Sequence, residues 1–193
     1  MADDNDNEPS INIVLELVII GNLSVGKYSI ITRYLNNKFE QEDAPILHNG
    51  PEMMVISIDG VKCILKIHET QPDHCDNFLS LTPNGFMLLY EIDDKKSFED
   101  VKKCYNEKIK KLKNNSCILV GNKLDLDNKR QVMKNEAELF AKENEMAFLE
   151  VSAKENVNVK EAFMRIAHDM LEIDQSLLSN ENNNNFCHKF CGC

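Results

Sequence analysis

One short segment constrains this chain more than any other: a glycine-framed loop between an apolar run and a helical pattern. The apolar run Ile11–Ile20 is typical of a strand buried on both faces of a parallel sheet, and Ser29–Asn36 then favours a helix. The loop has the form G-x-x-x-x-G-K, whose glycines let backbone N–H groups face a polyphosphate while the lysine reaches the terminal phosphates. The loop that grips the phosphates is Gly21–Lys27, and the predicted nucleotide-binding residues of this segment are Gly21, Asn22, Leu23, Ser24, Val25, Gly26, Lys27, Tyr28 and Ser29.

The residue after the lysine departs from this pattern. Loops of this form place Ser or Thr there, and the hydroxyl ligates Mg²⁺. Tyr28 occupies the position instead, and a phenol is too long and rigid to replace a ligand on a short stem. Ser29 follows, but the next position on a helix points about 100° away. The spacing of His48, His68 and His74 fits no common metal-ligand frame, so we assign no metal ligand and expect weak dependence on Mg²⁺.

Downstream of the loop, strand and helix patterns alternate along the chain. Asp59-Gly60, between two apolar runs, is a strong signal for a two-residue hairpin. Ser97, with Asp100 after it, resembles a capping box at the start of a helix. The alternation predicts an α/β fold with a mostly parallel central sheet, one antiparallel edge hairpin and helices on both faces. Strands are expected at Met53–Ile58, Val61–Ile67, Phe86–Ile92, Cys117–Val120 and Ala147–Val151, and further helices from Ser97, over Glu136–Asn144 and along Val159–Ile173.

Size and charge limit the function classes open to this chain. Its 193 residues suit one domain with a single core, and its net charge of −10 argues against a general nucleic-acid surface. No apolar run approaches the ~18 residues that a membrane span requires. We expect a disordered acidic N-terminus at residues 1–10, one domain at residues 11–177 and a disordered tail at residues 178–193. Four cysteines lack metal-type spacing, and the chain shows no secretory signal that would favour disulfides. We interpret them as small core hydrophobes or surface thiols: Cys63, Cys75, Cys104 and Cys117.

Two further polar motifs follow buried-strand patterns. The run CILV leads into Gly121-Asn122-Lys123-Leu124-Asp125, and the run FLEV leads into Ser152-Ala153-Lys154. Both motifs fall just past the carboxyl ends of strands, where ligands bind in open α/β sheets. Together with the phosphate loop, and in this order, they resemble the Ras superfamily of small GTPases, the Rab branch in particular. The resemblance covers roughly residues 11–176 and implies a P-loop NTPase fold of the G-domain type.

The resemblance implies a guanine-nucleotide site with GTP and GDP as its ligands. Asp125 would accept two hydrogen bonds from the Watson–Crick edge of guanine, Asn122 would touch the far side of the base, and Lys123 would pack over it. Ala153 would donate its backbone N–H to the base oxygen, and the other members of its motif belong to the same site. Guanine offers N–H donors on that edge whereas adenine has an unprotonated ring nitrogen, so a buried carboxylate can discriminate between them.

The Rab pattern shows four departures around the metal and the γ-phosphate, one of which covers two residues of the second switch. Tyr28 replaces the metal-binding hydroxyl, and Ile46 falls where a threonine should close over the γ-phosphate and the metal. In the second switch, Glu69 replaces an aspartate and Pro72 replaces a glycine, and a proline has no backbone N–H to give to the γ-phosphate. Asp73 stands where a glutamine should orient the attacking water. Because phosphoryl transfer depends on positioning and charge cancellation, we expect GTP hydrolysis to be weak or absent.

The tail predicts a lipid anchor. A C-a-a-X signal would need a cysteine where Phe190 stands, so that interpretation fails. Cys191-Gly192-Cys193 resembles the doubly prenylated ending of Rab proteins, which implies a geranylgeranyl group on Cys191 and on Cys193. Two chains suit the physics, because one lipid gives only marginal, reversible binding. The implied location is the cytoplasmic face of a membrane, with a cytosolic pool, and the implied partners are Rab-type effectors and regulators of a monomeric protein.

Three functional interpretations remain open at this stage. The preferred one is a lipid-anchored, Rab-like guanine-nucleotide-binding protein of vesicle or membrane trafficking, with degenerate switches and poor hydrolysis. The second is an ordinary switching GTPase whose loops use unfamiliar residues, with a helper protein that supplies catalytic groups. The third is a nucleotide-free, membrane-anchored interaction module in which Tyr28 fills the pocket.

Overall fold

A computed structural model describes residues 13–39, 50–79 and 81–190 of the chain. Eight-residue β1 leads into the loop with the glycine frame, and the remaining strands alternate with helices, as the sequence predicts. The strands are β1 (Ile13–Ile20), β2 (Glu52–Ile58), β3 (Val61–Thr70), β4 (Gly85–Glu91), β5 (Ser116–Asn122) and β6 (Ala147–Glu150). The helices are α1 (Lys27–Asn36), α2 (Asp76–Leu79), α3 (Lys95–Glu107), α4 (Lys134–Glu143) and α5 (Val159–Phe190), with short 3₁₀ segments η1 (Pro72–His74), η2 (Ile109–Lys111) and η3 (Leu124–Lys129).

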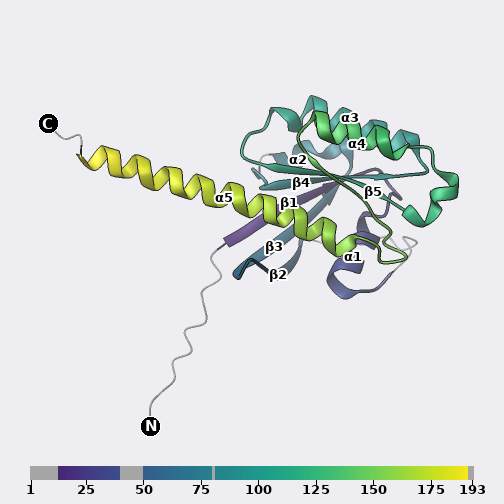
Figure 1. Ribbon diagram of the computed structural model, residues 1–193, viewed down its shortest axis with the longest axis horizontal. Helices are drawn as coiled ribbons and strands as arrows, with labels where there is room; N and C mark the ends of the chain where they lie inside the picture. The colour runs from purple at the N-terminus through teal and green to yellow at the C-terminus, as the bar shows by residue number, and fades with distance from the viewer. Residues whose placement is uncertain (1–12, 40–49, 80, 191–193) are drawn as a thin grey trace, which may run out of the picture.

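The strands form one sheet in the order β2-β3-β1-β4-β5-β6 (Figure 1). Every neighbouring pair is parallel except β2 and β3, which pair antiparallel at one edge. The predicted α/β class, the mostly parallel sheet and the edge hairpin are therefore confirmed. The carboxyl ends of β1, β4, β5 and β6 all lie at one end of the sheet, because these strands run in the same direction.

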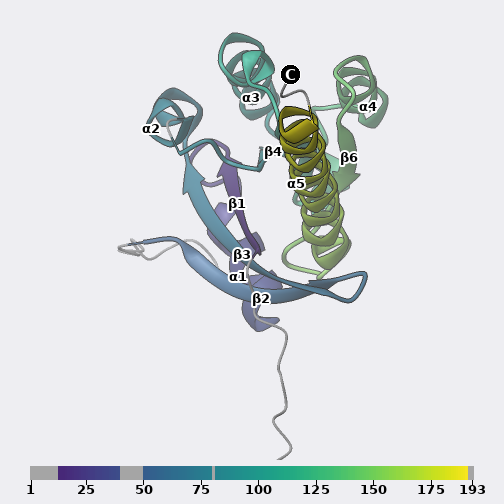
Figure 2. The ribbon, with the colours of Figure 1, turned by 90° about the vertical axis from the view of Figure 1, so that its left-hand side faces the viewer.

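Helices cover both faces of the sheet, as predicted. Buried side chains of α1 and α5 pack on one face and form one apolar cluster with the sheet. Buried side chains of α3 and α4 form a second cluster on the opposite face. In Figure 2 both helices lie on the side of the sheet away from α1. Strands β1, β4 and β5 are buried from both sides, which explains why their sequences are almost continuously apolar.

The hairpin between β2 and β3 has the turn that its sequence predicts. Asp59 and Gly60 both have positive φ angles, of 48° and 84°, as the common two-residue hairpin turn requires. Strand β3 continues to Thr70, past the predicted end at Ile67, so Glu69 belongs to the sheet.

Helix α5 packs through the apolar stripe that the sequence predicts. Val159, Phe163, Ile166 and Met170 are all at most 1% exposed. Gly85 allows this close packing, because a Cβ built there would lie 2.6 Å from the sulfur of Met170. None of the helices that the structure describes combines the length and apolar character needed to cross a lipid bilayer.

Helix α5 also continues beyond the predicted domain boundary at residue 177. It runs to Phe190, and residues 178–190 contain neither proline nor glycine to end it. In Figure 1 this last part of the helix extends away from the sheet. The helix differs from the disordered tail that the composition favours, whereas the acidic N-terminus at residues 1–10 lies outside the described residues.

One predicted helix cap is wrong. Asp94, not Ser97, caps α3, and its side chain accepts a hydrogen bond from the backbone N–H of Lys96 at 2.9 Å. Ser97 is buried in the first turn, where its hydroxyl donates to the carbonyl of Asp94 and accepts from the N–H of Glu91. The hydroxyl therefore ties α3 to the end of β4. Helix α1 likewise begins at Lys27, before the predicted start at Ser29.

Candidate functional site

A pocket of about 400 Å³ opens at the carboxyl ends of the parallel strands. Its walls come from the loop after β1, the first turn of α1, the segment that follows α1, the motif after β5 and the motif after β6. The lining residues are Ser24, Gly26, Ser29, Phe39, Asn122, Lys123, Asp125, Leu126, Ala153 and Lys154.

The phosphate loop is held in a conformation that needs its second glycine. Gly26 precedes α1 with a φ of 90°, a left-handed conformation that costs other residues free energy. A Cβ built on Gly26 would lie only 2.3 Å from the side-chain nitrogen of Asn122, so the loop passes too close to β5 for any side chain. Helix α1 begins directly after Gly26, so the N-terminal end of the helix, with its partial positive charge, faces the region where a phosphate would sit.

The loop wraps around the ammonium group of Lys27. This side chain is only 8% exposed, and its Nζ donates to the carbonyls of Gly21 at 3.0 Å and Asn22 at 2.8 Å. Asn22 points outward, and its amide donates to Asp100 of α3 at 2.7 Å. Leu23 is 71% exposed at the tip of the loop. The loop therefore places one positive charge beneath the backbone that would face a polyphosphate.

Asn122 connects the phosphate loop to the motif after β6. Its amide nitrogen donates to the carbonyl of Val25 at 2.9 Å, and its amide oxygen accepts from the N–H of Ala153 at 3.3 Å. The residue is only 2% exposed. The sequence predicts a contact between Asn122 and a base, and the structure adds this bridging role. The backbone N–H of Ala153, which is predicted to bind the base oxygen, donates to the amide oxygen of Asn122 in this structure.

Asp125 is fixed by a neighbouring hydroxyl. One of its oxygens accepts a hydrogen bond from the hydroxyl of Ser152 at 2.6 Å, and the other lies 3.9 Å from the Nζ of Lys154. Ser152 is almost fully buried and also accepts from the N–H of Glu155 at 3.0 Å. These contacts hold an anionic acceptor in the pocket, which suits a ligand edge that carries N–H donors.

Lys123 forms part of the pocket wall through its side chain. Its φ of 64° is left-handed, and its Nζ pairs with the carboxylate of Glu91, the last residue of β4, at 2.7 Å. Burial raises the pKa of Glu91, and the hydrogen bond from Lys123 opposes this by lowering it. The ion pair keeps the lysine stem along the pocket, where it can pack over a planar ligand.

Three residues of this site were missed in the sequence. Phe39 and Leu126 line the pocket, and Phe39 is an aromatic side chain at its mouth, 39% exposed. Arg33 of α1 donates to the carbonyl of Ala153 at 2.8 Å and to that of Lys154 at 3.0 Å, which secures the last motif. None lies in a recognisable motif, so no local signal marks them.

Tyr28 does not line this pocket. It contributes instead to a separate space of about 100 Å³ between α1 and the sheet, together with Leu35, Ile67 and Glu69. Ser29, in contrast, is 5% exposed and lines the main pocket. The phenol thus lies on the side facing β2 and β3.

The segment after β3 differs from an open loop. Glu69 is exposed near the end of β3, and Pro72 is buried at the start of η1. Asp73 is exposed within η1. Ile46 and both predicted lipid sites, Cys191 and Cys193, lie outside the described residues.

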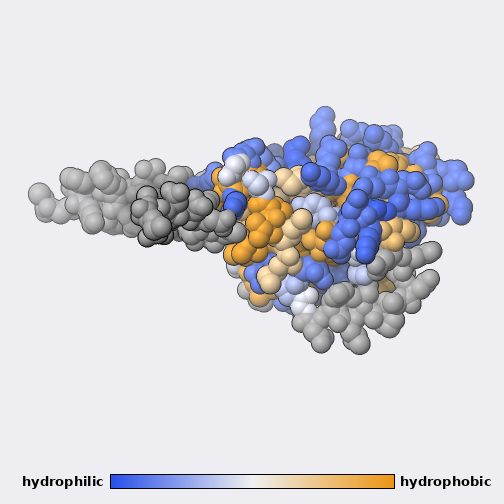
Figure 3. Space-filling view, turned by 90° about the horizontal axis from the view of Figure 1, so that it is seen from below, coloured by the Kyte–Doolittle hydropathy of each residue, from blue (hydrophilic) through white to orange (hydrophobic). Residues whose placement is uncertain are grey.

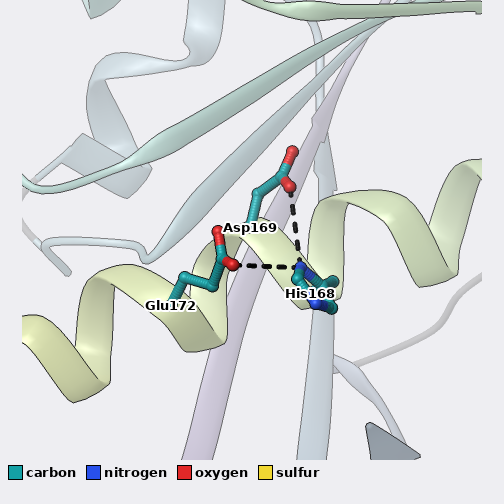
Figure 4. Close-up of side chains that lie close together, drawn as sticks. All are labelled: His168, Asp169 and Glu172. Carbon is teal, nitrogen blue, oxygen red and sulfur yellow. Dashed lines mark ion pairs between the residues drawn. The ribbon is translucent and has the colours of Figure 1, made fainter. Parts of the chain in front are cut away.

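One cluster of candidate metal ligands lies away from the pocket, on α5 (Figure 4). The Nδ1 of His168 lies 4.0 Å from Asp169 and 3.8 Å from Glu172, whereas its Nε2 lies 3.2 Å from Asp59 of the hairpin. Arg165 pairs with Asp169 at 3.3 Å. The Nδ1 of His168 thus faces both carboxylates of the cluster, and Arg165 already pairs with one of them. The contact between Nε2 and Asp59 ties α5 to the hairpin.

Comparison with known proteins agrees with this geometry. The family model described as "Ras family" matches residues 16–172. The chain is 34% identical over 168 residues to Ras-like protein rasS of Dictyostelium discoideum, an alignment that covers 83% of this chain and 86% of that protein. It is 32% identical over 185 residues to GTP-binding protein ypt2 of Schizosaccharomyces pombe, covering 91% and 92%. It is 29% identical over 174 residues to Ras-related protein Rab-10 of Diplobatis ommata, covering 83% of each. The chain therefore belongs to the Ras family of small GTPases and is similar to its Rab members.

Proposed function

We propose that this protein binds guanine nucleotides tightly, depends little on Mg²⁺ and hydrolyses GTP weakly or not at all. The observation that carries the proposal is an asymmetry within one site. On the side of the base, hydrogen bonds hold Asn122 to the phosphate loop and Asp125 to Ser152. On the side of the metal, Tyr28 replaces the expected hydroxyl and lines a different space.

The preference for guanine rests on the fixed carboxylate of Asp125. Ser152 holds one oxygen, so the carboxylate cannot rotate freely to accommodate a ligand that lacks N–H donors. A site that hydrogen-bonds a ligand N–H rejects an analogue without it, because its own polar group is then left unpaired. Discrimination of roughly 10⁴-fold against adenine nucleotides is within reach of such a site.

The weak metal dependence rests on the residues that surround the terminal phosphates. Mg²⁺ demands near-octahedral oxygen ligands at short range, and the Tyr28 phenol is directed toward Ile67 and Glu69. Pro72 offers no backbone N–H for a γ-phosphate. These residues do not fit a metal held by a loop hydroxyl, so phosphate binding would depend on Lys27 and on the N–H groups of the loop.

One calorimetric experiment tests these points. The full chain is titrated with GDP, GTP and ATP, in Mg²⁺ and in EDTA. We expect GDP and GTP to bind, ATP to fail, and EDTA to change the guanine-nucleotide Kd by less than about threefold. Asp125→Ala should abolish binding, while Asn128→Ala, an exposed neighbour in η3, should leave it unchanged. Absence of binding by both guanine nucleotides would favour an interaction module, and strong weakening by EDTA would favour an ordinary switching GTPase.

Hydrolysis is measured separately, in single turnover with bound GTP. We expect a rate at or below about 10⁻⁴ s⁻¹, the slow end of this class without a helper protein. A rate well above this value would show that other residues supply the missing charge and positioning.

We further propose lipid modification on Cys191 and Cys193 and a location on the cytoplasmic face of a membrane, with a cytosolic pool. The monomer would meet its effectors and regulators through exposed apolar side chains of the edge strand β2, where Met53 is 66% and Val55 is 54% exposed. Figure 3 shows hydrophobic residues at the surface among hydrophilic ones, seen from below. Isoprenoid labelling in cells tests the anchor: C191S and C193S should each lose one lipid and C187S none.

A further inference from the structure

Two buried cysteines meet between the segment that follows β3 and the helix α3. Cys75 lies between η1 and α2 and is fully buried, and Cys104 lies in α3 and is 3% exposed. Their sulfur atoms are 3.1 Å apart although the residues are 29 positions apart in the chain. A disulfide needs a separation of about 2.05 Å, so a shift of about 1 Å would join them.

We propose that Cys75 and Cys104 form a reversible disulfide when the protein meets a hydroperoxide, and that this bond fastens the segment Pro72–Leu79 to α3. The segment follows β3 directly, at the position of the second switch in the Rab pattern. The inference does not depend on nucleotide binding, since it rests on the two sulfur atoms and their surroundings alone.

The surroundings favour a thiolate on one of the two sulfurs. The pKa of Cys75 is lowered to about 7 because the hydrogen bond with Cys104 and the positive charge of Lys108 outweigh burial and the charge of Asp76, which raise it. The same hydrogen bond raises the pKa of Cys104. Lys108 caps the C-terminal end of α3, four residues after Cys104, and its Nζ donates to Asp76, next to Cys75, at 2.6 Å. Because Lys108 reaches the residue next to Cys75, we assign Cys75 as the attacking sulfur and Cys104 as the resolving one.

The chemistry balances with a hydroperoxide as the oxidant. The thiolate of Cys75 attacks the peroxide, the O–O bond breaks, and Cys75 becomes a sulfenic acid while water or an alcohol leaves with the proton. The sulfur of Cys104 then attacks the sulfenic sulfur, its proton joins the departing hydroxyl as water, and the S–S bond forms. The two thiols lose two electrons in total, and the peroxide gains them.

Access to Cys75 comes from the short elements around it. The 3₁₀ segment η1 has three residues and α2 has four, so each is stabilised by few internal hydrogen bonds and can open locally. Cys63 and Cys117 have different neighbours. The thiol of Cys63 in β3 contacts the carbonyl of Val61 at 3.8 Å, and that of Cys117 in β5 contacts Asn115 at 3.6 Å.

The test uses the full chain, treated with hydrogen peroxide, alkylated with N-ethylmaleimide and digested. We expect one cross-linked peptide that joins Cys75 to Cys104, with a loss of about 2 Da from the pair. Closing this loop should raise Tm by roughly 5 to 10 °C, and dithiothreitol should reverse both changes. C75A and C104A should each lose the cross-linked peptide and the rise in Tm, whereas C63A, the matched buried control, should keep both.

Circular dichroism of each variant before treatment shows whether it is folded. The wild-type peptide map decides the question even if a variant fails to fold. Recovery of Cys75 and Cys104 as separately alkylated peptides, or of Cys75 as an irreversible sulfinic acid, would overturn the proposal. An unchanged Tm in the cross-linked wild type would contradict the claim that the bond fastens the segment to α3.

Discussion

Replacement of Asn122 by alanine should lower the free energy of unfolding of the whole domain. The Asn122 side chain joins two loops that no other described side chain connects in the same way. Its amide donates to the carbonyl of Val25 in the phosphate loop and accepts from the N–H of Ala153 after β6. Both partners lose a buried hydrogen bond in the N122A variant. The loss therefore falls on the loops themselves, before any ligand binds.

The size of the effect follows from the geometry. The bond to Val25 is 2.9 Å long, and a buried carbonyl left without a partner costs about 1–3 kcal/mol. The bond to Ala153 is longer, at 3.3 Å, and its loss adds up to about 1 kcal/mol. We expect the free energy of unfolding to fall by about 2–4 kcal/mol and Tm by roughly 10 °C.

Urea unfolding followed by circular dichroism measures this change without nucleotide. Asn128→Ala is the matched control, because Asn128 is an exposed asparagine close by in η3 and its loss should change stability by less than about 0.5 kcal/mol. Asn122→Asp keeps an acceptor for Ala153 but sets a negative oxygen against the Val25 carbonyl, so it should cost at least as much as alanine.

An N122A variant with the stability of the control would refute the reasoning. The bridge would then be dispensable, and Asn122 would act only on a bound base. A loss in N122A together with full stability in N122D would also contradict it, because the donor to Val25 would then carry no energy.

Three further predictions follow from other parts of the structure. Tyr28→Ser restores a short hydroxyl at the first turn of α1, so EDTA should accelerate release of fluorescent GDP from Y28S by at least about tenfold and leave the wild type almost unchanged; equal behaviour of the two would count against the metal argument. Burial lowers the pKa of His68 below its ordinary value of 6.5, so the unfolded chain binds the proton more tightly, and the free energy of unfolding should fall as pH drops below 6.5; His68→Gln should flatten this decline in urea titrations across pH. Glu150→Ala removes the two-point partner of Arg130, which keeps Asp127 at 2.7 Å, and should lower the free energy of unfolding by about 2 kcal/mol in a urea melt; a loss below about 1 kcal/mol would mean that Asp127 and water replace the carboxylate.

Much of the fold could be predicted from local patterns. The continuous apolar runs identify β1, β4 and β5 because a strand covered on both faces has no polar side to encode. Asp59-Gly60 fixes the hairpin because both residues tolerate a positive φ. The exact ends of helices and strands do not follow from local patterns. Ser97 and Asp94 both suit a helix cap, and only the backbone geometry selects Asp94.

Most of the predicted base-side residues line the pocket, because their motifs follow neighbouring parallel strands. Asn122, Lys123, Asp125, Ala153 and Lys154 line one pocket because parallel strands bring their carboxyl ends to one edge. Ser152 contributes through its hydrogen bond to Asp125 rather than as part of the pocket wall.

The sequence alone determined the order of strands and helices, the glycine frame of the loop and the residue types around the base, because these depend on periodicity and on backbone freedom at single positions. The tertiary structure decided that Asn122 bridges two loops, that Phe39 lines the pocket and that the thiols of Cys75 and Cys104 meet. Such contacts join residues far apart in the chain, and their free energy depends on the distance and direction between atoms. Neither quantity is encoded in any local run of residues.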